Sequence, residues 1–250
     1  SFSSAIFLYI FFLPNLAFAI PSMMIKGIIP LWSIGVEEQF YAVWPLLLSK
    51  TKGGLKLILS VILIYLGIKG VAYFWNVQNP ESVIYEYIHY TRIDIMAIGA
   101  LGTWIYFAKK ERLLSVIFHP LTQLVAVGVF LYSLFVHPIK LDPFIDSEIN
   151  ALFYLVIIMN VSLNKRNWIK VDNVVLNYLG KISFGIYVYH MLIVMSFPYL
   201  FSSLTGVLPV WILYSILLLL IIAVASVSYF YFEKPILAYK NKYAVVNSSN

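Results

Sequence analysis

Eight apolar runs, each long enough to cross a lipid bilayer as an α-helix, constrain this 250-residue chain more than any other feature. A helical span needs about 20 consecutive, mostly apolar residues. The runs cover residues 3–20, 32–49, 55–74, 91–108, 120–137, 147–163, 180–199 and 209–232. None shows the alternating, turn-separated pattern of an outer-membrane barrel strand. The sequence therefore predicts an all-α, polytopic transmembrane helix bundle with about eight spans.

The composition excludes the soluble classes of protein. Charged residues make up 11% of the chain and hydrophobic residues 62%, whereas an ordinary globular domain carries roughly 25% charged residues. The chain has no cysteine, so disulfides and thiolate nucleophiles are excluded. Its four histidines lack the paired spacing of a metal site. We expect a lipid bilayer around the chain, no bound metal and no nucleic-acid partner.

Lysine and arginine concentrate in every second loop between the expected spans. The basic clusters are Lys50, Lys52 and Lys56, then Lys109, Lys110 and Arg112, then Lys165, Arg166 and Lys170, and finally Lys234, Lys240 and Lys242. The alternate loops are poorer in basic residues and carry acidic ones such as Glu81 and Glu86. By the positive-inside rule, both ends of the chain, including a tail of residues 236–250, are predicted to be cytoplasmic.

The first cluster of polar residues in a span begins at Trp32 and Ser33 and continues through Glu37, Glu38, Gln39 and Tyr41. Two adjacent carboxylates about two turns into an apolar helix are costly, because ionised groups are expensive at membrane depth. One interpretation is a polar cavity that these side chains line. The other is that Glu37 and Glu38 lie at the interface and reach out to water.

A second polar cluster, Arg92 and Asp94, opens the fourth expected span from the same face of the membrane. Arg92 is predicted to supply a cation for the Glu37 or Glu38 carboxylate, or to pair with Asp94. The alternative is an ordinary arginine at the membrane edge that extends its side chain to lipid head groups. Asp94 lies two residues deeper, where the second interpretation is harder to apply.

The seventh expected span carries the third cluster, in which Ser183, Tyr187 and His190 share a helical face because they are spaced by four and three residues. His190 is expected near the middle of the membrane. A single histidine is either a hydrogen-bonded packing residue or part of a site, and the residue types alone leave both interpretations open.

Four motifs then give a specific resemblance. Leu31-Trp-Ser-Ile-Gly-Val-Glu-Glu-Gln-Phe-Tyr-Ala-Val-Trp-Pro45 resembles the signature of the acyltransferase-3 family of integral membrane acyltransferases. Arg92-Ile-Asp94 with Gly99, Gly180–His190 and Phe232-Glu-Lys-Pro235 are similar to three further motifs of that family, in the family's order. The resemblance implies an enzyme that transfers an acyl group, often acetyl from acetyl-CoA, to a hydroxyl of an extracytoplasmic glycan.

The resemblance also implies what the printed sequence lacks. The family fold is a bundle of ten helices whose first helix carries a basic residue and, eleven positions on, a histidine taken as catalytic. A pair of arginines in the loop before the third helix is associated with the donor. Neither element is present before Asn15. Residues 1–235 are therefore expected to form an acyltransferase-3 transmembrane domain without its first two helices.

The resemblance assigns roles to the residues of the three clusters. Glu37 and Glu38 are expected to orient the family's histidine, and His190 is a candidate base within this chain. The expected substrate-binding residues are Trp32, Ser33, Gln39, Tyr41, Arg92, Asp94, Ser183 and Tyr187. An acyl-CoA donor, an envelope glycan acceptor, no bound cofactor and the cytoplasmic membrane of a bacterium follow as expectations. The alternatives are a non-catalytic homologue and a proton-coupled carrier or glycan flippase, since buried ionisable groups suit those as well.

Overall fold

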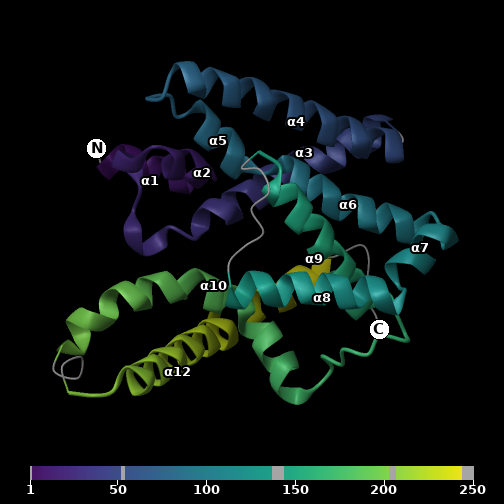
Figure 1. Ribbon diagram of the computed structural model, residues 1–250. Coiled ribbons are helices and arrows are strands. Elements are labelled where there is room, and N and C mark those ends of the chain that lie inside the picture. The colour runs from purple at the N-terminus through teal and green to yellow at the C-terminus, as the bar shows by residue number, and fades with distance from the viewer. Residues whose placement is uncertain (1, 52–53, 137–143, 203–206, 244–250) are drawn as a thin grey trace. The chain divides into compact units, whose positions relative to one another are not determined.

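The computed structural model describes residues 2–51, 54–136, 144–202 and 207–243, and within those ranges all regular secondary structure is helical (Figure 1). This confirms the predicted all-α class. The described residues form two compact units. The first unit comprises residues 1–23 and 32–170, and the second comprises residues 24–31 and 171–250.

The first unit contains nine α-helices and one 3-10 turn within the described residues. They are α1 (Phe2–Ile10), α2 (Pro14–Ala19), η1 (Pro21–Met23), α3 (Leu31–Thr51), α4 (Leu55–Gln78), α5 (Ile84–Thr91), α6 (Ile93–Phe107), α7 (Glu111–Ile117), α8 (Pro120–Phe135) and α9 (Asp146–Leu163). Helix α6 is central, because it packs against both α4 and α9, while α2 packs against α5 and α8 against α9.

The second unit is built around two long helices. Its elements are η2 (Lys26–Ile28), α10 (Val174–Leu200), α12 (Val210–Ser228), the π-helix η3 (Tyr229–Glu233) and α13 (Lys234–Tyr243). Helices α10 and α12 pack along each other, and η2 packs against α10. At Gly185 the backbone of α12 comes so close that an added Cβ would lie 3.1 Å from Ala225 Cα, so a small residue there sets the helix spacing. Helix α13 extends into the predicted tail, whose residues 244–250 lie outside the described residues.

Several helices have the length and apolar character of membrane spans. Four apolar stretches qualify, Leu55–Gln78, Asp146–Leu163, Val174–Leu200 and Val210–Tyr239, and α7 with α8 forms a fifth that is bent by 52°. Large apolar side chains such as Leu63, Leu218 and Phe135 are exposed on these helices, as expected where lipid is the solvent. The fold is therefore that of a multi-pass membrane protein, while the predicted count of about eight spans stays a prediction.

Two of the predicted runs are interrupted by backbone breaks. Residues 3–20 form α1 and α2 rather than one helix, because Phe12 adopts a positive φ of 57° and Pro14, at the first position of α2, has no N–H to continue the bonding. The run 91–108 begins with a break at Arg92, whose φ of 48° and ψ of 37° are left-handed. An arginine in this conformation is uncommon, and it separates α5 from α6.

Candidate functional site

A buried amide network joins α2, α3 and α5 in the first unit. Asn15 is fully buried, and its Nδ2 donates to Gln39 Oε1 at 3.3 Å and to Thr91 Oγ1 at 3.1 Å. Gln39 Nε2 in turn donates to Asn15 Oδ1 at 2.9 Å and to the Phe12 carbonyl at 2.7 Å. The network thus places the first turns of α3 beside the residue that precedes Arg92. Gln39, predicted as a substrate-binding residue, is engaged here in holding helices together.

The two glutamates of the α3 motif lie on a different side of that helix from Gln39. Glu37 and Glu38 are both exposed, as is Tyr41, while Gly35 and Val36 are buried. Gly35 is small by necessity, because an added Cβ would overlap the ring of Pro14 on α2. Ser33 is half-buried near the start of the helix. In the described residues the structure therefore does not bring Glu37 or Glu38 to the buried polar groups of the first unit.

An aromatic frame holds the Arg92 side chain. Phe18, Trp32 and Tyr90 pack against one another with ring centroids 4.7–5.6 Å apart. The Arg92 guanidinium lies over the Trp32 ring at 5.3 Å and over the Tyr90 ring at 5.9 Å, which stabilises the cation through its flat face. This places Trp32 and Arg92, two of the predicted substrate-binding residues, in direct contact.

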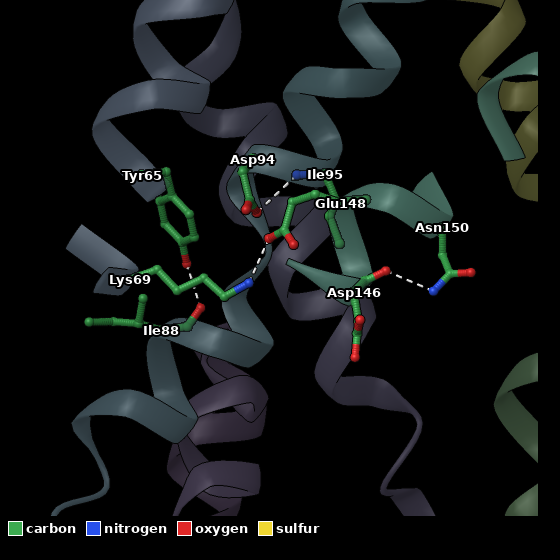
Figure 2. A network of polar contacts seen from close by, with 8 residues as sticks. All are labelled: Tyr65, Lys69, Ile88, Asp94, Ile95, Asp146, Glu148 and Asn150. Carbon is green, nitrogen blue, oxygen red and sulfur yellow. Dashed lines mark hydrogen bonds and ion pairs between the residues drawn. The ribbon is translucent and has the colours of Figure 1, made fainter. Parts of the chain in front are cut away.

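Asp94 belongs to a cluster of three buried charged side chains that includes Lys69 from α4 and Glu148 from α9. The exposed fractions are 1% for Asp94, 2% for Lys69 and 8% for Glu148. Lys69 Nζ lies 2.6 Å from Glu148 Oε1 and 5.1 Å from the centroid of the Phe144 ring. Figure 2 shows the Glu148 carboxyl between the Lys69 ammonium and the Asp94 carboxyl. We call Lys69, Asp94 and Glu148 the charge cluster.

The charge cluster has one cation for two carboxyl groups. Asp94 Oδ1 accepts from the backbone N–H of Ile95 at 2.9 Å, whereas Asp94 Oδ2 and Glu148 Oε2 have no hydrogen-bond partner in the described part of the chain when both are ionised. One proton shared between these neighbouring carboxyls would satisfy both oxygens and make the cluster neutral. Neutrality matters here because unpaired charge is costly at membrane depth.

His89 on α5 lies beside the same groups. Its ring is 5.5 Å from that of Tyr85 and 5.3 Å from that of Tyr90, centroid to centroid. Burial, followed by the nearby Lys69 and Arg92 cations, lowers the pKa of His89 below its ordinary value. Its Nδ1 is buried without a hydrogen-bond partner in the described ranges. His89 is therefore neutral near pH 7, since a further cation there would face two others.

The third predicted cluster lies on α10 in the second unit. His190 Nδ1 is 2.7 Å from the Tyr187 carbonyl, so Nδ1 carries the proton and Nε2 is left as an acceptor, because a carbonyl oxygen can only accept. The Tyr187 hydroxyl donates to the Pro30 carbonyl at 2.8 Å, and the two rings are 5.9 Å apart. Ser183 donates to the carbonyl of Gly180 in its own helix. The structure thus brings Tyr187 and His190 together and leaves Ser183 one turn away.

The Phe232-Glu-Lys-Pro235 motif of the second unit takes part in a chain of polar contacts next to the π-helix η3, in which two hydroxyl groups and one carboxylate are linked. Ser228 Oγ donates to Glu233 Oε1 at 3.3 Å and lies 3.3 Å from the Tyr189 hydroxyl. Lys234 Nζ lies 5.6 Å from the centroid of the Phe230 ring. A single π-helical turn is rare and is often found at functional sites. Here it turns Glu233 back toward Ser228 on α12.

Comparison with known proteins identifies the family. The family profile described as an acyltransferase domain, acyltransferase-3, matches residues 2–230. The chain belongs to the acyltransferase-3 family. All three predicted clusters and the charge cluster lie inside this acyltransferase-3 match, which ends within the second unit.

Two relatives of the chain are O-acetyltransferases named OatA, from Staphylococcus aureus strains NCTC 8325 and COL. Each is 26% identical over 222 residues, which is 82% of this chain and 35% of the relative. The chain thus spans about a third of the length of the curated relatives it matches. No solved structure matches it.

Sequence reasoning missed three residues of this acyltransferase-3 domain that the structure places in buried polar contacts. Lys69 was counted only as a member of an apolar run, Glu148 was assigned to an acidic loop between the expected spans, and Asn15 was given no role. The signal for Lys69 is available in the sequence, because it is the one charged residue between Lys56 and Glu81. A lone lysine well inside an apolar run requires a buried partner.

Proposed function

We propose that this chain is the membrane-embedded part of an O-acyltransferase. It transfers an acyl group, acetyl from acetyl-CoA, to a hydroxyl of an extracytoplasmic envelope glycan, and it lies in the cytoplasmic membrane of a bacterium with both printed ends on the cytoplasmic side. The observation that carries the proposal is the family match over residues 2–230. The names of the OatA relatives support acetyl as the group transferred, and the alternating basic loops support the orientation.

The reaction moves one acyl group and one proton. The acceptor hydroxyl oxygen attacks the thioester carbonyl, a C–O bond forms and the C–S bond breaks. The hydroxyl proton passes to a base, and the departing thiolate takes up a proton. A base works best when it is oriented and has a pKa near the working pH. His190 is the candidate base in this chain, supported by its bond to the Tyr187 carbonyl, which leaves Nε2 as the acceptor.

The remaining proposed roles follow the chemistry of each group. Glu37 and Glu38 would orient the imidazole of the histidine that the family is taken to use as its base, as a carboxylate does in a triad. Arg92 and Asp94 would hold polar groups of the substrates. The proposed substrate-binding set is completed by Trp32, Ser33, Gln39, Tyr41, Ser183 and Tyr187. No metal or bound cofactor is needed for this transfer, because acyl-CoA is a substrate.

The test is acetyl transfer in inverted membrane vesicles that contain the full-length protein, with isolated envelope glycan loaded into the lumen and labelled acetyl-CoA added outside, where the cytoplasmic face lies. We expect label in the glycan, and a loss of at least tenfold in the initial rate with Glu38→Gln and with His190→Gln. Glu81→Gln, on an exposed turn, is the matched control and should keep the rate. Unchanged transfer in Glu38→Gln or His190→Gln would remove that residue from the mechanism, and no labelled glycan would contradict the activity.

A second candidate function, proton-coupled transport, is supported by one observation. The charge cluster places a lysine and two carboxyls on three helices with two unsatisfied oxygens, an arrangement that suits a group that binds and releases a proton. In proteoliposomes with an internal pH dye, a carrier would acidify or alkalinise the lumen when glycan is added without acetyl-CoA. No pH change under those conditions would favour the acyltransferase.

A further inference from the structure

Arg92 is a cation without an anion in the part of the protein that the structure describes. Among the described residues, the ion pair joins Lys69 to Glu148 and does not include Arg92. No carboxylate there neutralises the Arg92 guanidinium. Its Nε atom is buried and has no hydrogen-bond partner among the described residues. This half-buried guanidinium is held by two aromatic rings but by no anion, so it is available to pair with an oxyanion from outside the described chain.

A cavity of about 350 Å³ lies next to Arg92, between α6 and α9. It belongs entirely to the first unit. Its polar end is formed by Arg92 with Ser147 and Asn150, close to the first residues of both helices. The first turns of both helices also carry the carboxyl groups of Asp94, Asp146 and Glu148. An anion at this end therefore depends on the Arg92 cation, to which the partial positive charge of the helix starts adds. The size falls in the range of small-molecule binding sites.

The other end of the cavity is apolar. Along α6 and α9 the lining changes to residues such as Ile98, Leu155 and Ile158. At 1.5 Å per residue, Ile158 lies roughly 16 Å further along α9 than Ser147. A polar end with an unpaired cation, followed by an apolar channel of this length, matches a molecule with an anionic head and a hydrocarbon chain.

The aromatic frame determines which part of Arg92 faces the ligand. Trp32 and Tyr90 lie against the guanidinium face, while all five N–H donors of an arginine lie in the plane of the group. The edge that remains matches the oxygen spacing of a phosphate, to which arginine donates two parallel hydrogen bonds. The left-handed backbone of Arg92 is also strained for a residue with a side chain.

We propose that the cavity between α6 and α9 binds a phosphoryl amphiphile, with the phosphate on Arg92 and the hydrocarbon chain along Ile98, Leu155 and Ile158. Two sources share this chemistry: a membrane phospholipid with net negative charge, unlike phosphatidylcholine, and an isoprenoid phosphate of the kind that carries sugars across membranes. The site goes beyond acyl transfer, and its binding is measured without acetyl-CoA, so a failed binding test and a failed transfer test are separate results.

The test measures binding of radiolabelled farnesyl phosphate to the full-length protein in nanodiscs of phosphatidylcholine. We expect saturable binding, one molecule per chain, that unlabelled farnesyl phosphate displaces. Farnesol, which lacks the head, and inorganic phosphate, which lacks the chain, should not displace it at equal concentration. A second set of nanodiscs contains phosphatidylglycerol. Loss of binding in that set assigns the site to phospholipid, and retained binding assigns it to isoprenoid phosphate.

Three variants test the geometry. Arg92→Gly removes the cation but suits the left-handed backbone, and it should weaken binding about tenfold or more, as expected for a lost charge-assisted hydrogen bond. Gly99→Leu projects a side chain from the cavity wall, where an added Cβ meets nothing within 4 Å, and should block the chain. Gly128→Leu on α8 has the same open surroundings away from this cavity and should bind like the parent.

The proposal is overturned by any of three results. The first is no saturable farnesyl phosphate binding in phosphatidylcholine together with no phosphatidylglycerol retained through purification. The second is unchanged binding in both Arg92→Gly and Gly99→Leu. The third is equal displacement by farnesol, which would remove the anionic head from the recognition. Thermal unfolding midpoints of the variants, compared with the parent, show that each protein is folded when binding is measured.

Discussion

At the scale of single residues, the charge cluster holds three helices of the first unit together. Lys69, Asp94 and Glu148 come from α4, α6 and α9, and their contacts join three helices at one point. Asp94 was expected from the sequence because it follows Arg92 in a motif. Its partners Lys69 and Glu148 were not expected. They lie 79 positions apart, and nothing in a single sequence indicates that two residues so far apart will meet. Long-range pairing of this kind depends on how the helices pack.

Removing one member of the Lys69–Glu148 pair should destabilise the protein more than removing both. Lys69→Met leaves two carboxyls without their cation, and we expect a loss of about 3 kcal/mol in the free energy of unfolding. Lys69→Met combined with Glu148→Gln leaves no unpaired charge when the proton of the cluster stays on Asp94, and the new amide can donate to the carbonyl oxygen of the Asp94 carboxyl group, so the loss should be below about 1 kcal/mol. Reversible unfolding in mixed micelles measures both. Equal losses would show that the pair contributes through packing alone.

His89 gives the protein a pH-dependent stability with a defined sign. Because its pKa in the folded state lies below the ordinary 6.5, the unfolded chain binds the proton more readily as the pH falls. The contribution of His89 is therefore complete above pH 6.5 and is lost as the pH falls from there toward the folded-state pKa. His89→Asn does not titrate, so its thermal midpoint should fall less than that of the parent between pH 7.5 and pH 5. Parallel curves would contradict the assignment.

At the scale of elements, the sequence predicts helices better than it predicts their breaks. The runs 55–74, 120–137 and 147–163 correspond to α4, α8 and α9 within a few residues, because long apolar runs leave the backbone no alternative to helix in lipid. The breaks at Phe12 and Arg92 were missed. Neither residue is a glycine, so the usual sequence marker of a left-handed turn is absent.

Glycine positions in α10 separate close helix packing from open surface. An added Cβ at Gly185 would lie 3.1–3.2 Å from backbone and side-chain atoms of Ala225, whereas one at Gly180 meets nothing within 4 Å. Gly185→Leu should therefore push α10 from α12 and cost about 1–3 kcal/mol. Gly180→Leu is the matched control in the same helix, with no loss and a small gain in helix propensity. Unfolding of the two variants by the same denaturant series checks this, and equal midpoints would contradict the close approach.

At the scale of the whole molecule, the orientation in the membrane is open to a direct test because the chain contains no cysteine. A single cysteine introduced into these 250 residues is then their only thiol. In intact cells, a membrane-impermeant maleimide should label Glu81→Cys, which is predicted outside, and should spare Lys110→Cys and Lys165→Cys until the membrane is permeabilised. The reverse pattern would place both ends of the chain outside. Labelling of all three after permeabilisation is the control for accessibility of the thiols.

The bond between Tyr187 and Pro30 has a consequence for biosynthesis. Its two residues are 157 positions apart, although both belong to the second unit, whose first segment precedes most of the first unit in the chain. At synthesis rates of 5–20 residues per second, the segment Met24–Leu31 waits on the order of 10–30 seconds for α10 to leave the ribosome. During that interval the first unit has already been made and inserted. Assembly of the second unit is therefore a late, long-range step that follows the insertion of the helices between its two parts.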